Sequence, residues 1–360
     1  MNSVYYLYFK KINCILSYII FIVVPLIFTI SCNKNRLWIR QWSNTTPLSV
    51  SRSGACGVSV NGFIYVMGGV EANTSGKGFL VSGEYTRIRS NGELEEWKTL
   101  PSLNVPRGFM GCVEANGYIY VIGGSNFENG MNLLNSVEKA HINKDGSLGA
   151  WSLTTPMRTR RRGVTTVSIN GYIYSLGGYN GVFLRTVEMT KVKDHGELKE
   201  WQILNGIFTS SRYIHGGAYA NGNIYIVGGH DSMDGSAKNS TEWSRINPDN
   251  TLHGWVSGPP LNSPRFLTRV AATDNYLYVV GGYNGNYLKS VEKATINKDG
   301  SPDKWQYALP LKEEREGAAI ITDRGYIYVI GGSNKGRYLN DVEFAAINKD
   351  GELGSFVSAK

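Results

Sequence analysis

Short apolar strands recur along the chain, and six of them end at a pair of glycines. The Gly-Gly pairs begin at residues 68, 123, 177, 228, 281 and 331, so successive pairs lie 50–55 residues apart. Before one pair the chain reads as a strand at Gly111–Ala115, the turn Asn116-Gly117 and a strand at Tyr118–Ile122. Asn-Gly is a strong two-residue hairpin signal because both positions accept positive φ. The pattern therefore predicts a β-hairpin before each Gly-Gly pair.

A second hairpin follows each pair, as in Ser136–Ile142 and Ala150-Trp151, which are joined through Asn143-Lys144-Asp145-Gly146. A glutamate and, 13 residues later, an aromatic residue mark it: Glu84 and Trp97, Glu138 and Trp151, Glu188 and Trp201, Glu242 and Trp255, Glu292 and Trp305, Glu343 and Phe356. An arginine stands 16 residues before each Gly-Gly pair: Arg52, Arg107, Arg161, Arg212, Arg265 and Arg315. Four strands in each of six units predict an all-β fold, a six-bladed β-propeller with four antiparallel strands per blade.

The Gly-Gly pair after an aromatic-rich strand, the upstream arginine and the downstream tryptophan resemble the kelch repeat. The resemblance covers residues 38–360 and implies a propeller whose ring is closed by N- and C-terminal strands in one blade. Trp42 also fits the tryptophan position, so seven aromatic positions serve six blades. The segments around Trp42 and Phe356 thus both remain candidates for the outer strand of the last blade. A seventh blade cut short at Lys360 is the alternative.

The N-terminus predicts export. Lys10-Lys11 precedes an apolar run from Ile12 to Ile30, and Ser31-Cys32 follows it. This order resembles a bacterial lipoprotein signal, in which the cysteine becomes lipidated. The alternatives are an uncleaved membrane helix, because the run is close to spanning length, and simple secretion. We assign residues 1–32 to the signal, 33–37 to a linker and 38–360 to the propeller, and predict a membrane-anchored lipoprotein of the bacterial envelope, periplasmic or surface-exposed, with Cys32 as its lipidation site.

Charge changes this picture little. The formal net charge is +8, and 18% of residues are charged. A mild positive excess suits an acidic partner, but the chain has no basic and aromatic ladder of the kind that binds single-stranded nucleic acid. We therefore expect no nucleic-acid partner.

The six recurring arginines have two interpretations. Their number equals that of the recurring glutamates, which favours structural ion pairs, because a buried guanidinium needs a carboxylate partner. The kelch resemblance implies instead that residues leading into the first strands border a partner-binding face. In that case Arg52, Arg107, Arg161, Arg212, Arg265 and Arg315 would rim a basic funnel.

Features that do not recur are the better functional candidates. Arg158, Arg160 and Arg162 surround Arg161, although the repeat calls only for Arg161. Such a cluster suits recognition of carboxylate or phosphate groups, and a solvated loop is the alternative. The loops between second and third strands are longer in blades 1, 2 and 4, and unequal loops on a regular scaffold commonly carry recognition. We therefore expect the site on the face that carries the strand 2–3 loops and the inter-blade loops.

The histidines and cysteines add two open questions. His215 and His230 both belong to blade 4 near that face, and we count them as ligand-face candidates. Two histidines alone do not make a metal site, so we expect no metal and no cofactor. Cys56 and Cys112 lie on equivalent strands of adjacent blades with opposite parity. They either face each other and form a disulfide or remain two isolated thiols.

These observations favour a non-enzymatic binding propeller, lipid-anchored at the cell envelope, that recognises a protein or glycan, including an acidic one. The alternative is a periplasmic enzyme that acts on an acidic sugar, because sialic-acid mutarotases resemble this chain in being secreted six-bladed kelch propellers. No catalytic residue of that family can be matched here, so we assign none.

Overall fold

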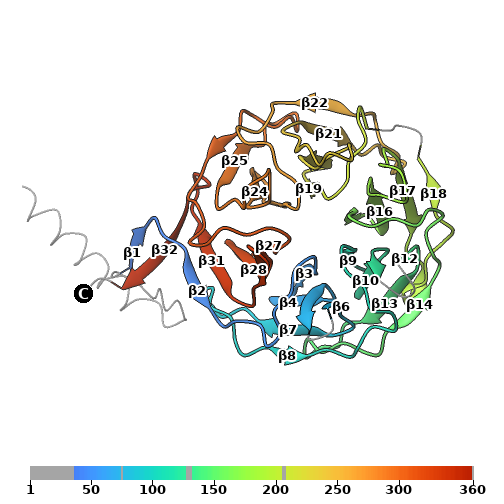
Figure 1. Cartoon of the computed structure of the whole chain (residues 1–360), viewed down its shortest axis with the longest axis horizontal. Coiled ribbons are helices and arrows are strands. Elements are labelled where there is room, and N and C mark those ends of the chain that lie inside the picture. Colours follow the sequence, from blue (N-terminus) through green and yellow to red (C-terminus); the bar gives the residue numbers. More distant parts are fainter. Residues whose placement is uncertain (1–35, 74–75, 127–131, 205–207, 359–360) are drawn as a thin grey trace, which may run out of the picture. The chain divides into compact units, whose positions relative to one another are not determined.

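The computed structural model describes residues 36–73, 76–126, 132–204 and 208–358 (Figure 1). Internal contacts separate a propeller unit, Trp38–Phe356, from a terminal unit of residues 1–37 and 357–360. The predicted signal, residues 1–32, and its Cys32 lie outside the described residues. Within the described ranges, no helix has the length and apolar character needed to cross a membrane.

The propeller unit is a ring of six antiparallel sheets, with the first strand of each blade nearest the axis and the fourth at the rim (Figure 1). Blades 1–3 consist of β3 (Cys56–Val60), β4 (Phe63–Met67), β7 (Gly83–Arg87) and β8 (Lys98–Thr99); β9 (Gly111–Ala115), β10 (Tyr118–Ile122), β13 (Val137–His141) and β14 (Ser152–Thr154); β15 (Thr165–Ile169), β16 (Tyr172–Leu176), β17 (Val187–Lys191) and β18 (Gln202–Ile203). Blades 4–6 consist of β19 (Gly216–Ala220), β20 (Asn223–Val227), β21 (Thr241–Arg245) and β22 (Val256–Gly258); β23 (Arg269–Ala272), β24 (Tyr276–Val280), β25 (Val291–Thr295) and β26 (Gln306–Tyr307); β27 (Ala319–Asp323), β28 (Tyr326–Ile330), β31 (Val342–Ile347) and β2 (Ser43–Thr45). The predicted all-β, six-bladed architecture is confirmed.

Short hairpins extend three of the loops between second and third strands. They are β5 (Val70–Asn73) with β6 (Gly76–Phe79), β11 (Ser125–Asn126) with β12 (Asn132–Leu133), and β29 (Ser333–Asn334) with β30 (Arg337–Tyr338). One 3-10 turn, η1 (Asp194–Gly196), joins β17 to β18. Two of the three hairpins lie in blades 1 and 2, where the long loops were predicted.

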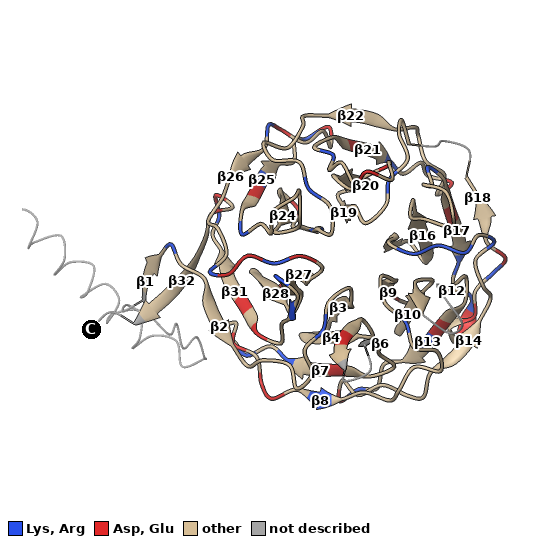
Figure 2. Ribbon diagram, in the orientation of Figure 1, with Lys and Arg blue, Asp and Glu red and all other residues tan. Residues whose placement is uncertain are grey.

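Each recurring arginine forms a buried ion pair with the recurring glutamate of its own blade. Figure 2 marks the acidic positions in red and the basic positions in blue along the ribbon. The nitrogen–oxygen distances are 2.5–3.1 Å and the side chains are 0–5% exposed, in the pairs Arg52–Glu84, Arg107–Glu138, Arg161–Glu188, Arg212–Glu242, Arg265–Glu292 and Arg315–Glu343. Burial lowers the pKa of Arg107, and the charge of Glu138 partly offsets that effect. The structure therefore corrects the expectation of a basic funnel, because these six guanidinium groups are enclosed within the blades.

Each pair also fixes the loop that enters its blade. Arg107 Nη1 donates to the carbonyls of Gly123 and Ser136, at 3.0 and 3.1 Å. The carboxylate of Glu138 accepts hydrogen bonds from the backbone amides of Asn104 and Val105. The pair thus joins the Gly-Gly segment, the third strand and the inter-blade loop, which explains why Arg, Gly-Gly and Glu recur together.

A recurring tyrosine links each blade to the next. The residue three positions before each Gly-Gly pair is fully buried, and its hydroxyl needs a partner inside the protein. It donates to a backbone carbonyl in the strand 3–4 turn of the next blade, at 2.6–2.9 Å: Tyr65 to Gly146, Tyr120 to Gly196, Tyr174 to Asn250, Tyr225 to Gly300, Tyr278 to Gly351 and Tyr328 to Gly92. Burial raises the pKa of these tyrosines.

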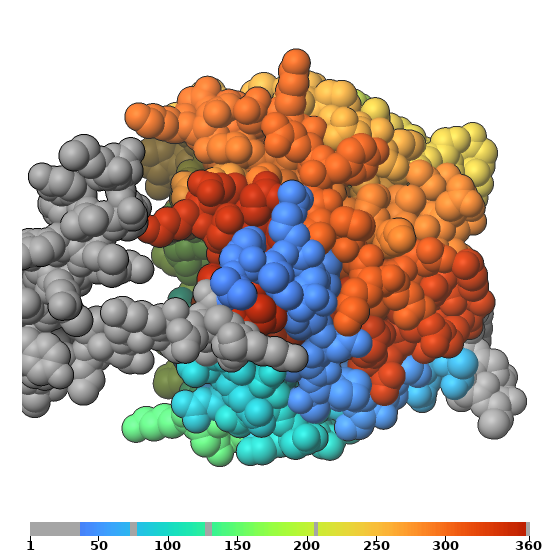
Figure 3. All heavy atoms as spheres, turned by 90° about the vertical axis from the view of Figure 1, so that its left-hand side faces the viewer, coloured from blue at the N-terminus to red at the C-terminus, as the bar shows by residue number. Residues whose placement is uncertain are grey.

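The N-terminal segment closes the ring. Asn44 of β2 lies opposite Glu343 of β31, just as Thr99 of β8 lies opposite Glu84 of β7. The segment after Trp42 therefore forms the outer strand of blade 6, and Figure 3 shows it, in blue, against the red C-terminal strands. The C-terminal strand β32 (Leu353–Ser358) pairs with the last two residues of β31 on one side and with β1 (Arg36–Ile39) on the other. The seventh aromatic position thus belongs to the closing blade.

A disulfide joins the first strands of blades 1 and 2. Cys56 and Cys112 are bonded, with their Cα atoms 5.8 Å apart. Cys56 follows Arg52 by four residues and Cys112 follows Arg107 by five, so their side chains face each other across the junction between the blades. The structure thereby answers the question of pairing that the sequence left open.

Candidate functional site

The strand 2–3 loops and the inter-blade loops lie at one end of the propeller, which we call the loop face. The residue after each recurring arginine bridges the residue after the Gly-Gly pair of the same blade. The bridges are Ser53–Val70, Gly108–Ser125, Arg162–Tyr179, Tyr213–His230, Phe266–Tyr283 and Glu316–Ser333. The opposite end, with the strand 1–2 and strand 3–4 turns, is the turn face. The six bridge pairs differ in every blade, so the scaffold presents six different side-chain pairs on the loop face.

Six backbone hydrogen bonds form a closed ring around the axis at the loop face. The residue two positions after each recurring arginine donates its amide to the equivalent carbonyl of the preceding blade, at 2.7–3.0 Å. These residues are Gly54, Phe109, Gly163, Ile214, Leu267 and Gly317, and Gly54 donates to Gly317. All six have positive φ, including the β-branched Ile214 at 45°. Positive φ is a true outlier for such a residue, and the hydrogen-bonded ring holds it in place.

Arg158 and Arg160 are exposed cations on this face. With Thr159, Asn132, Leu133 and Asn180 they border a pocket of about 430 Å³ between blades 2 and 3. Neither guanidinium is hydrogen-bonded to a carboxylate among the residues that the structure describes. Arg161, between them in the cluster, is enclosed in its ion pair with Glu188. The predicted cluster thus provides two exposed cations for a ligand. Its remaining arginine, Arg162, is partly buried and has a different role.

Arg162 packs against aromatic rings. Its guanidinium carbon lies 4.8 Å from the centre of the Phe109 ring and 5.5 Å from that of Tyr213. Arginine against an aromatic face is a favourable cation–π arrangement. Arg162 therefore connects the cationic part of the loop face to its aromatic part.

The aromatic part extends over blades 3, 4 and 5. Neighbouring rings lie 5.0–5.6 Å apart, centre to centre, in a set that we call the aromatic arc: Phe183, Tyr179, Tyr213, His230, Phe266, Tyr283 and Tyr287. All except His230 are partly exposed. Val182 and Met233, in the strand 2–3 loops of blades 3 and 4, are 64% and 83% exposed. Aromatic residues, arginine and methionine are enriched in protein interfaces.

The aromatic arc was not predicted from the sequence. A signal was available, because Tyr213 and Phe266 each follow a recurring arginine, and Tyr179 and Tyr283 each follow a Gly-Gly pair. The residues at these positions differ from blade to blade, whereas the neighbouring Arg and Gly-Gly recur in all six.

The two histidines of blade 4 have separate surroundings. His230 lies in the aromatic arc and donates from Nδ1 to the Ser232 carbonyl at 3.1 Å, and burial lowers its pKa. His215 is fully buried beside Phe208, and desolvation, with Arg212 and Arg269 nearby, lowers its pKa well below the ordinary value. Across the described ranges, no three His, Cys, Asp or Glu side chains gather in a way that could hold a metal ion. His230 thus lies buried among the aromatic rings of the loop face, and His215 lies deeper in the interior.

Comparison with protein families identifies the repeat. The kelch motif matches residues 106–139, 160–189, 264–293 and 314–343. Each match begins one residue before a recurring arginine and ends at, or one residue after, the recurring glutamate of that blade. The motif therefore spans the ion pair that fixes each blade.

The chain is also similar to several curated proteins. It is 25% identical to Kelch repeat and BTB domain-containing protein 1 of cowpox virus over 68% of this chain and 40% of that protein. It is 25% identical to Beta-scruin of Limulus polyphemus over 69% of this chain and 27% of that protein, and 30% identical to Kelch-like protein 41b of Danio rerio over 49% and 27%. The matched region spans less than half of the length of each of these relatives.

One solved structure, that of YjhT, aligns with 87% of this chain and 99% of its own, with a TM-score of 0.68 and 15% identity. At that identity the likeness establishes the fold.

Proposed function

Because this chain is a kelch-repeat β-propeller, we propose that it works by binding, and that it recognises an acidic segment of a protein partner through the loop face of blades 2 to 5. The observation that carries the proposal is the continuity of Arg158 and Arg160 with the aromatic arc, through Arg162. Exposed cations attract carboxylates, and partly exposed aromatic rings provide the desolvated contact area that dominates interface energies.

The interior supports binding over acid–base catalysis. A sugar enzyme needs a side chain that exchanges protons near neutral pH beside its substrate. The central cavity of the propeller, lined by described residues, has no aspartate, glutamate, histidine or lysine in its wall. Its ionisable members are Tyr219 and Arg269, because Cys56 and Cys112 are joined in a disulfide and do not titrate. The alternative of an enzyme acting on an acidic sugar therefore has no general acid or base of ordinary kind in that cavity.

Selection of peptides tests the proposed ligand chemistry. A displayed random peptide library is panned against the purified full-length chain, and the recovered sequences are compared with the input library. We expect enrichment of peptides that combine Asp or Glu with an aromatic or aliphatic residue, and release of these peptides as salt rises. Recovery of only neutral or basic peptides contradicts the proposal.

We also propose that the propeller is held at the bacterial envelope by a lipid on Cys32. The order of basic, apolar and small residues before Cys32 supports this, and so does the Cys56–Cys112 disulfide, because disulfides persist mainly in oxidising compartments. The anchor would hold the propeller outside the cytoplasm.

Replacing Cys32 by Ser should abolish the anchor. In cells that process lipoproteins, we expect the parent protein to sediment with membranes and its mature N-terminal peptide to carry acyl chains in mass spectra. The Cys32→Ser variant should lose both properties, whereas Cys14→Ser, which changes a cysteine in the apolar run, should retain them. Membrane association of the Cys32→Ser variant at the parent level would favour the uncleaved membrane helix.

A further inference from the structure

One position in the inner wall departs from the pattern of the other blades. The residue four positions after each recurring arginine is the first residue of the first strand of its blade. In five blades this residue is small: Cys56, Gly111, Thr165, Gly216 and Ala319. In blade 5 it is Arg269, the first residue of β23. Five blades form the same strand with a small residue at this position. The repeat therefore does not require the guanidinium of Arg269.

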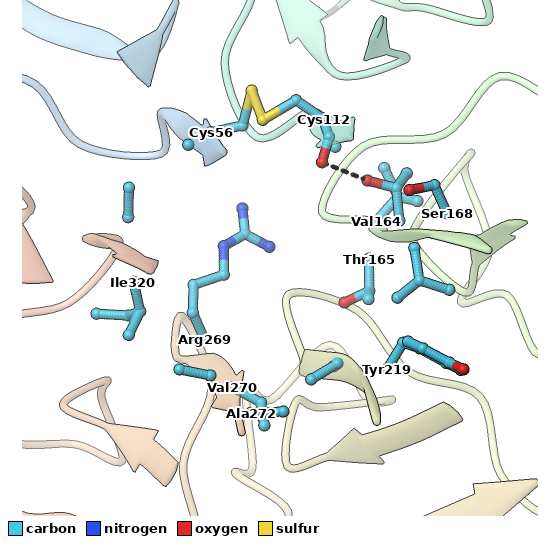
Figure 4. Close-up of a pocket in the computed structure, with 18 of the residues that line it drawn as sticks. Cys56, Cys112, Val164, Thr165, Ser168, Tyr219, Arg269, Val270, Ala272 and Ile320 are labelled. Carbon is cyan, nitrogen blue, oxygen red and sulfur yellow. Dashed lines mark hydrogen bonds between the residues drawn. A yellow bond between two sulfur atoms is a disulfide. The ribbon is translucent and has the colours of Figure 1, made fainter. Parts of the chain in front are cut away.

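Arg269 extends into the central cavity of the propeller. The cavity has a volume of about 290 Å³ and is lined by the first strands of all six blades, with Arg269 among its wall residues. Figure 4 shows the guanidinium in the space between Ile320, Thr165 and the Cys56–Cys112 disulfide. A Cβ at Gly57, Gly111 or Gly217 would lie within 3 Å of a side chain of the neighbouring blade, so these glycines let the first strands pack closely around the cavity. The volume is close to the lower end of small-molecule sites, roughly 300–1,000 Å³.

The surroundings of Arg269 provide no counter-charge. Its side chain has no hydrogen-bond or carboxylate partner among the described residues, and no acidic side chain lines the cavity. Desolvation alone lowers the pKa of Arg269 to about 10. The six scaffold arginines are fully buried and each faces a glutamate, whereas Arg269 is partly exposed and faces none in the part of the chain that the structure describes. Arg269 is still charged at neutral pH and is the one charged side chain among the described residues that border the cavity.

Four of the five wall hydroxyl groups already donate to backbone carbonyls, those of Thr165, Thr166, Ser168 and Thr322, and the Tyr219 hydroxyl accepts from the Gly222 amide. Thr166 donates to the Cys112 carbonyl at 3.2 Å, and Thr322 donates to the Ala272 carbonyl at 2.7 Å. They bind neighbouring blades together, so Arg269 is the main source of free donors in the cavity. A guanidinium has five N–H donors in a planar fork, which matches the two oxygens of a carboxylate or phosphate.

The loop-face end of the cavity is narrow. Arg269 also borders a space of about 10 Å³ inside the ring of six backbone hydrogen bonds, which is enough for roughly one water. The larger cavity continues toward the turn face, since Ser168, Ala272 and Thr322, near the turn ends of their strands, line it. A ligand would therefore enter from the turn face and meet Arg269 at the inner end.

We propose that the central cavity binds a small oxyanion, a carboxylate or phosphate group, on Arg269. This site is distinct from the loop face, because it lies on the other side of the backbone ring and uses none of the aromatic arc. It is a binding site only, with Arg269 as the anchoring cation. The test of the loop-face proposal and the test of the cavity site can therefore give independent results.

Thermal unfolding of the purified full-length chain tests this site. The probes are sodium phosphate, acetate and glucuronate, with glucose as the neutral control and sodium chloride holding ionic strength constant. A ligand that binds only the folded protein raises its stability with concentration. We expect a saturable rise in Tm with at least one oxyanion and none with glucose. If phosphate or acetate raises Tm as much as glucuronate does, the site binds a simple oxyanion. If glucuronate binds more tightly than acetate, the site binds a sugar acid.

Two variants of Arg269 and one control locate the effect. Arg269→Met should fold, retain the parent Tm or exceed it in anion-free buffer, and lose the anion-dependent rise, because a partly desolvated cation without a carboxylate partner is replaced by an apolar side chain of similar length. Arg269→Lys should bind at least about 10-fold more weakly, since lysine lacks the planar fork. Arg158→Met, on the loop face, should respond like the parent. No response of the parent to any oxyanion, or an undiminished response of both Arg269 variants, overturns the proposal.

Discussion

Replacing Glu138 by Gln should lower the free energy of unfolding by about 3–5 kcal/mol, the cost of leaving one partner of a buried ion pair alone. The substitution keeps the shape of the side chain but leaves the Arg107 guanidinium without its opposite charge. It also disturbs the acceptor for the amides of Asn104 and Val105, so the loop entering blade 2 loses its fixed conformation. Urea unfolding, with midpoint and slope measured separately, gives the change.

Glu96→Gln is the matched control. Glu96 is exposed in the strand 3–4 connection of blade 1, and the substitution removes the same charge. We expect a change within about 0.5 kcal/mol, as for most surface substitutions. If Glu138→Gln proves as mild as Glu96→Gln, the ion pairs do not hold the blades and the reason for the recurrence of Arg and Glu must be sought elsewhere.

Reversing the two exposed cations should weaken binding of an acidic peptide roughly 100-fold, because attraction becomes like-charge repulsion at both positions. Arg158→Glu/Arg160→Glu changes only exposed side chains on the loop face, so the free energy of unfolding should change little. Most of the loss should appear at low salt and shrink as salt screens the charges. An unchanged affinity at low salt would show that the peptide binds elsewhere.

Recurrence in the sequence predicted the scaffold well. Six regularly spaced Gly-Gly pairs were sufficient for the number of blades, and the equal numbers of Arg and Glu favoured the ion pairs that the structure contains. The six arginines could not be excluded as ligands from the sequence, because their burial depends on strands that are distant along the chain. Arg107, for example, is enclosed by Gly123, Ser136 and Glu138 together.

The ring closure and the candidate sites were harder to predict from the sequence. Trp42 and Phe356 both fitted the outer-strand pattern, and only the register between Asn44 and Glu343 distinguishes them. Arg269 has no local signal, since its importance comes from five small residues at the equivalent positions of other blades and from a cavity that all six blades form. The aromatic arc likewise arises only when blades 3, 4 and 5 are placed side by side.

The most direct test of the central claim is a titration of one selected acidic peptide into three proteins at low salt. These are the parent, Arg158→Glu/Arg160→Glu and Lys144→Glu/Lys298→Glu, whose two exposed lysines lie in strand 3–4 turns on the turn face. Both double variants change the net charge equally, so the comparison separates position from overall charge. We expect the loop-face variant to lose roughly 100-fold in affinity and the turn-face variant to lose less than about 5-fold. Equal losses in the two variants would contradict a binding site on the loop face.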